Sequence, residues 1–152
     1  MAGTTNRAKY RIHAIVYRNA APPTNFYLAL CTDAAAPDAD TNTMAELTEI
    51  AAGNGYGAGG LLVNRNAVDF DSLVEDDVND RSELQLRDFV WTAAGGQIPS
   101  GGAGARYAVL TDDNAMPANR EIWHWWDFGG DYQVSDGRTL TFRDGEMRIT
   151  EP

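Results

Sequence analysis

The sequence predicts a mainly β protein, either an antiparallel β-sandwich or a jelly-roll-like fold, with one short N-terminal helix. Short apolar runs recur along the chain, and turn-forming residues separate them, as in many-stranded sheets. The 15 glycines cluster at 53–60, 95–104 and 129–137, where reversals between strands require them. Strands and helices do not alternate, so a parallel sheet is not expected. We find no internal boundary and expect one domain over 1–152.

The helix is expected at residues 5–18. Threonine and asparagine at 4–6 can cap its N-terminus. Tyr10, Ala14 and Tyr17 fall on one helical stripe. Tyr10 and Ala14 also fit the alternation of a strand, so that alternative stays open.

The first strand follows at 25–32, a run of bulky apolar residues entered through a pair of prolines. The dipeptide Asp144-Gly145 is a strong signal for a two-residue hairpin joining the last two strands. The other strands are expected at 61–68, at 84–91 with a bulge, and at 105–111, 121–128, 139–142 and 146–150.

Charge and composition exclude several classes of partner. The formal net charge is −10, which disfavours nucleic acid and anionic membranes, since both attract basic surfaces. No apolar run is long enough for a transmembrane helix, and no secretory signal is evident. We therefore expect a chain that folds in a reducing cytoplasm. Cys31, the single cysteine, is expected to be a buried, inert thiol.

No catalytic, cofactor or metal site is expected. His13 and His124, the two histidines, have no second ligand at metal spacing. No serine lies in a nucleophile elbow, and no glycine-rich phosphate loop follows a strand. The acidic stretch 69–80 could bind calcium through several carboxylates, but it lacks the pattern of an EF-hand loop, and a solvated loop is the favoured interpretation. We expect a protein that is not an enzyme.

An aromatic cluster is the strongest candidate for partner contact. In a regular strand Trp123 and Trp125 would share one face, and Trp126 would lie on the other. The favoured interpretation is a central strand buried on both sides; the functional alternative is a hot spot for a protein or a platform for a sugar. Arginine supplies nearly all the basic charge and is enriched at interfaces. The candidate partner-contact residues are Trp123, Trp125, Trp126, Arg106 and Arg120.

Two segments carry a resemblance to a known group of proteins. They are the strand Asn25-Phe26-Tyr27-Leu28-Ala29-Leu30-Cys31-Thr32-Asp33 and, after a polar loop, Gly53-Asn54-Gly55-Tyr56-Gly57. In this order they resemble small virion structural proteins of tailed bacteriophages, of the decoration, tail or fibre type. The positions shared with that group have structural roles by this interpretation: Tyr27, Ala29, Leu30, Thr32 and Tyr56.

The resemblance implies a bacteriophage virion structural protein made in the host cytoplasm. The expected role is a capsid decoration (cementing) protein or a small tail or fibre component, acting by protein–protein assembly. Its partners would be capsid or tail subunits and further copies of itself. The loops 33–43 and 93–104 are long enough to be ordered by a neighbouring subunit. The alternative is a carbohydrate- or receptor-binding β-module that uses Trp123, Trp125 and Trp126.

Overall fold

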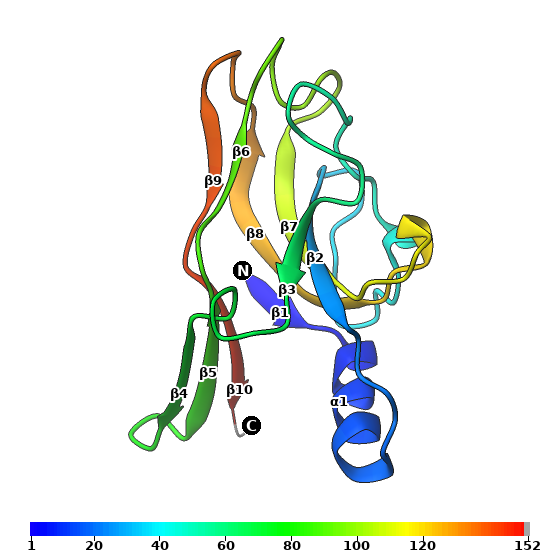
Figure 1. Ribbon diagram of the computed structural model, residues 1–152, viewed down its shortest axis with the longest axis vertical. Coiled ribbons are helices and arrows are strands. Elements are labelled where there is room, and N and C mark those ends of the chain that lie inside the picture. The colour runs from blue at the N-terminus through cyan, green and yellow to red at the C-terminus, as the bar shows by residue number, and fades with distance from the viewer. Residues whose placement is uncertain (151–152) are drawn as a thin grey trace.

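The computed structural model describes residues 1–150 and shows a mainly β fold with antiparallel sheets and one N-terminal helix, as the sequence predicts (Figure 1). A five-stranded sheet forms one layer, and the two-stranded ribbon β6–β9 packs against it. A three-stranded sheet continues from that ribbon beyond the sandwich. In order across each sheet, the strands are β1 (Ala2–Thr4), β8 (Ile122–Tyr132), β7 (Ala105–Thr111), β2 (Asn25–Cys31) and β3 (Leu61–Asn64); β6 (Phe89–Thr92) and β9 (Thr139–Phe142); and β10 (Gly145–Thr150), β5 (Arg81–Leu86) and β4 (Ser72–Asp76).

The core lies between the five-stranded sheet and the β6–β9 ribbon. Leu28 and Leu30 of β2 point into it from the sheet, and Phe89 and Trp91 of β6 point into it from the ribbon; all four are buried. Burying one such side chain contributes about 1.5–3 kcal/mol. On the opposite face of the sheet, Met44 of the short 3-10 helix η1 (Met44–Glu46) and Leu47 just after it pack against a second cluster of buried side chains.

Helix α1 (Asn6–Arg18) forms where the sequence predicts it. The hydroxyl of Thr5 caps it by accepting a hydrogen bond from the Ala8 amide at 3.0 Å, and the same hydroxyl donates to the carbonyl of Ile122 in β8. Asn19 ends the helix in the left-handed conformation. Only Ala8 and Ala14 are buried along α1, so most of the helix projects from the sandwich.

The predicted hairpin at Asp144-Gly145 is wrong. β9 continues into β10, and their common partner is the continuous β5–β6 segment: Phe142 pairs with Phe89, and Gly145 with Leu86. Asp144 has a positive φ of 52° and lies between β9 and β10. The Asp-Gly dipeptide therefore marks a kink between two consecutive strands and not a hairpin turn. The same backbone conformation that suits a turn serves here to redirect the strand.

Two further differences concern residues 61–80. The strand expected at 61–68 ends at Asn64, because the Asn66 side chain accepts hydrogen bonds from the amides of Val68 and Asp69 and forms a turn. The acidic stretch expected to be a loop contains β4, which pairs with β5. Its first carboxylate, Asp69, is buried and binds Arg87 and Asn64.

The long loops are held by the chain itself. Ile98, inside the loop 93–104, is fully buried and exchanges two backbone hydrogen bonds of 2.9 Å with Val134. In the loop 33–43, the Ala39 carbonyl accepts from the amide of Asn6 at 2.7 Å. Each loop is therefore attached to the sandwich or to the start of α1 by backbone hydrogen bonds within the chain.

Candidate partner-binding surfaces

A bulge in β8 decides where the tryptophans point. Thr111 of β7 pairs with Ile122, and the preceding β7 residue, Leu110, pairs with His124. Trp123 is therefore an extra residue in β8 with no partner in β7. Trp123 consequently packs on the inner side of the sheet, with its ring 5.2 Å from that of Phe26. The prediction that Trp123 and Trp125 share a face is wrong, because the bulge breaks the alternation.

The tryptophans lie mainly in the interior. Trp125 and Trp126 are each 8% exposed, on opposite sides of the sheet. The Trp126 indole donates to the carbonyl of Glu146 at 2.9 Å, which ties β8 to β10. The Trp125 ring lies over Gly3, where a Cβ would come within 3.0 Å of it. The interpretation of a strand buried on both sides holds for Ile122 and for 124–126, whereas Trp123 is partly buried.

The two candidate arginines bind within the chain. Arg120 is only 7% exposed, with its guanidinium 3.7 Å from the centre of the Tyr27 ring. It donates to the carbonyls of Gly59 and Asn114. Arg106 is more accessible and forms an ion pair of 2.6 Å with Asp127 of β8. Arg120 therefore serves internal packing in this structure, whereas Arg106 borders the surface.

Tyr56 anchors the glycine-tyrosine motif in the core. The buried Tyr56 hydroxyl donates to the Glu49 carboxylate at 2.6 Å and accepts from the Leu30 amide at 2.9 Å, just beyond the end of β3. Gly55 has a φ of +106°, and a Cβ there would lie 2.0 Å from the carbonyl oxygen of Thr92. The structural roles assigned to these residues agree with this packing.

Two buried ionisable side chains lie on opposite faces of the five-stranded sheet. Cys31 is buried as expected, and burial raises the pKa of its thiol. His124 forms a 2.8 Å hydrogen bond through Nδ1 with the Thr4 hydroxyl, and burial lowers the pKa of its imidazole to about 4. His124 is therefore neutral near pH 7.

Within residues 1–150, no group of three or more histidine, cysteine or acidic side chains is arranged to hold a metal ion. In the same part of the chain, no helix has the length and apolar character needed to cross a membrane.

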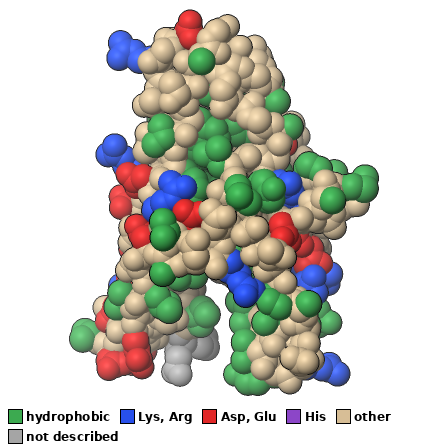
Figure 2. All heavy atoms as spheres, in the orientation of Figure 1, with side chains coloured by type: hydrophobic (Ala, Val, Ile, Leu, Met, Phe, Trp, Pro, Cys, Tyr) green, Lys and Arg blue, Asp and Glu red, His purple; other side chains and the backbone are tan. Residues whose placement is uncertain are grey.

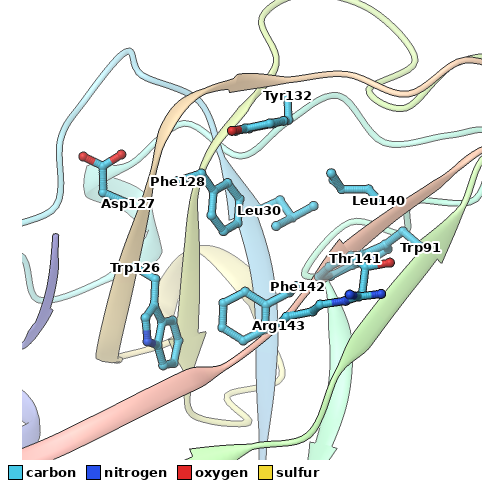
Figure 3. Close-up of a pocket in the computed structure, with 10 residues that line it drawn as sticks. All are labelled: Leu30, Trp91, Trp126, Asp127, Phe128, Tyr132, Leu140, Thr141, Phe142 and Arg143. Carbon is cyan, nitrogen blue, oxygen red and sulfur yellow. The ribbon is translucent and has the colours of Figure 1, made fainter.

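An aromatic cavity of about 440 Å³ opens between β8 and β9 (Figure 3). Trp126 and Phe128 of β8 line it together with Phe142 of β9, and Tyr132 stands at one end. Of the predicted contact residues only Trp126 lines this cavity. Phe128 belongs to the aromatic cluster recognised in the sequence, although it was not among the predicted contact residues. Tyr132 was missed, although it lies in the same strand.

A second feature that the sequence did not reveal is an exposed apolar surface on the sheet β4–β5–β10, which we call the arm. Leu73 is 76% exposed and Ile149 is 66% exposed. By the strand register, Leu73 lies beside Leu84, and Leu84 lies beside Met147, so these side chains share one face. The other face carries a network of ion pairs formed by Asp76, Arg81, Glu83, Glu146 and Arg148.

Helix α1 also exposes apolar side chains, since Tyr10 is 60%, Val16 64% and Tyr17 79% exposed. The arm and α1 project from the same end of the sandwich and are separated by a gap (Figure 2). No protein family, curated protein or solved structure compared with this chain matches it. Function must therefore be inferred from these surfaces.

Proposed function

We propose that this chain is a bacteriophage virion structural protein that acts by protein–protein assembly, as a capsid decoration (cementing) protein or a small tail or fibre component. The observation that carries the assembly role is the pair of apolar projections, the arm and α1. Soluble monomers rarely leave large apolar patches in water, and such patches mark interaction sites. The virion setting is supported by the resemblance of 25–33 and 53–57 to phage structural proteins.

The partners in this proposal are capsid or tail subunits and further copies of the chain. Each contact can be weak, because many copies on a repeating lattice bind with high combined affinity. The apolar side chains Leu73, Ile149 and Tyr17 supply contact area, and the sandwich holds the strands and helix that display them.

Quantitative mass spectrometry of purified phage particles tests the proposal. The chain should be present at a fixed copy number relative to the major capsid protein, and a Leu73→Ser, Ile149→Ser variant should be incorporated at a lower copy number. Val90→Ser is the matched control, because Val90 is also an exposed apolar strand residue but lies outside the arm. Absence of the wild-type chain from particles would refute the proposal.

The cavity between β8 and β9 supports a second candidate, a carbohydrate- or receptor-binding β-module. Aromatic rings such as those of Phe128 and Tyr132 can stack on the apolar face of a sugar. Trp123 and Trp125 pack in the core, which leaves Trp126 as the tryptophan at this cavity. A glycan array probed with the isolated chain should then give signals that Tyr132→Ala abolishes. Absence of binding by the wild-type chain would contradict this candidate.

A further inference from the structure

The exposed side of α1 carries an aromatic stripe. Tyr10 and Tyr17 are seven residues apart, two helical turns, and so lie on the same side of the helix. His13 lies between them, with its ring centre 6.0 Å from that of Tyr17. Val16 extends the apolar surface next to Tyr17. The stripe faces solvent along most of the length of the helix.

This stripe lies in a basic environment. Helix α1 contains four basic residues and no acidic residue. Arg7 and Arg11 are paired with Glu121 of the sandwich. Lys9 and Arg18 make no ion pair within residues 1–150 and are exposed to solvent. An acidic partner surface is therefore favoured for this helix.

The apolar face of the arm has the opposite charge around it. Glu75 lies on this face, because it pairs with Ser82 and Ser82 pairs with Ile149. Asp77 and Asp80 follow in the turn at the end of the β4–β5 hairpin. These three carboxylates are exposed and form no ion pair within the part of the chain that the structure describes.

The exposed side of α1 and the apolar face of the arm both carry exposed apolar side chains, and their charges are opposite. Within one chain, α1 and the arm lie apart (Figures 1 and 2). We infer that α1 of one copy docks on the apolar face of the arm of a second copy. This inference rests on the homo-oligomer in the proposed function and names its contact surfaces. Such an interface joins two different surfaces, so it repeats from copy to copy and produces a closed ring or an open filament.

A symmetric contact between like surfaces is disfavoured by charge. Two α1 helices face to face would bring Lys9 and Arg18 of both copies together, and two arms would bring together Glu75 of each. Like charges across an interface oppose association, whereas the contact between α1 and the arm pairs opposite charges. Added salt should consequently weaken the assembly.

Light scattering coupled to size-exclusion chromatography provides the test, using the full chain. The wild-type protein should have a mass of at least two chains of 16.5 kDa each. The helix variant Tyr10→Ser, Tyr17→Ser and the arm variant Leu73→Ser, Ile149→Ser should each be monomeric. An equimolar mixture of the two variants should form a dimer and nothing larger, because the helix variant keeps its arm and the arm variant keeps its helix.

Val90→Ser is the matched control and should assemble as the wild type does. Thermal melting of each variant separates loss of contact from loss of folding. A wild-type chain that stays monomeric, a variant that still assembles alone, or a mixture that stays monomeric although both variants are folded would each overturn the inference. The proposed function is tested separately by the copy number in particles. If the chain is monomeric in solution but present in particles at a fixed copy number, only the α1–arm contact is overturned.

Discussion

Replacing Tyr56 by Phe removes a single oxygen atom from the core and should strongly destabilise the fold. The Tyr56 hydroxyl donates a hydrogen bond to the carboxylate of Glu49 and accepts one from the backbone amide of Leu30. β3 pairs with β2 only as far as Leu28, so the hydroxyl takes the place of a strand partner for the Leu30 amide.

The size of the effect follows from these contacts. A buried amide left without an acceptor costs about 1–3 kcal/mol, and a hydrogen bond to a charged group contributes about 1.5–3 kcal/mol. Glu49 keeps the hydrogen bond from the Gly59 amide at 2.6 Å, which limits the loss on its side. We therefore expect Tyr56→Phe to lower the free energy of unfolding by about 2–4 kcal/mol and the melting temperature by roughly 5–15 °C.

Urea unfolding followed by circular dichroism measures this difference. Tyr132→Phe is the matched control, because Tyr132 is about half exposed and its hydroxyl makes no hydrogen bond within residues 1–150. The control should change the free energy of unfolding by less than about 0.5 kcal/mol. A loss below about 1 kcal/mol for Tyr56→Phe would refute the argument that the hydroxyl completes the sheet.

Three further predictions follow from buried positions. Gly145→Val should destabilise the fold by crowding, since a Cβ at Gly145 would lie 2.4 Å from the Phe142 ring; an unchanged melting temperature would contradict this. Cys31 should react slowly with a thiol reagent in the native protein and rapidly in urea, and rapid native labelling would place it at the surface. The folded-state pKa of His124 is about 4, below its value of about 6.5 in the unfolded chain, so unfolded chains bind more protons between these values. Stability should be fully present above about pH 6.5 and fall by up to about 3 kcal/mol as the pH drops toward 4. His124→Gln should remove this contribution in urea titrations, and His13→Gln, on the exposed side of α1, should keep it.

The helix and most strands could be predicted because their signals are local. Thr5 caps α1 through an amide three residues away, and the apolar run of β2 needs only burial to become a strand. The mainly β fold follows from such runs and the turns between them.

The orientation of the tryptophans could not be predicted, because it depends on a partner strand. The bulge that displaces Trp123 is defined by the pairing of Leu110 with His124, which no residue within β8 specifies. Asp144-Gly145 has the composition of a hairpin, yet it lies where two strands bend together, opposite Leu86. Both errors arise where distant segments determine local geometry.

The arm shows why the proposed assembly surface could not be recognised in the sequence. β5 and β10 extend the ribbon whose other end, β6 and β9, packs on the five-stranded sheet. Burial decreases along the extension: Leu86 is fully buried, Leu84 and Met147 are partly buried, and Ile149 is largely exposed. The alternation of apolar side chains continues to Ile149 in β10, whereas Ser82 and Glu75 interrupt it in β5 and β4. The second layer that buries Leu86 is missing at the far end. In the proposed contact, α1 of a second copy covers the exposed apolar side chains of the arm, and its aromatic stripe and basic side chains complement their apolar surface and the carboxylates around it.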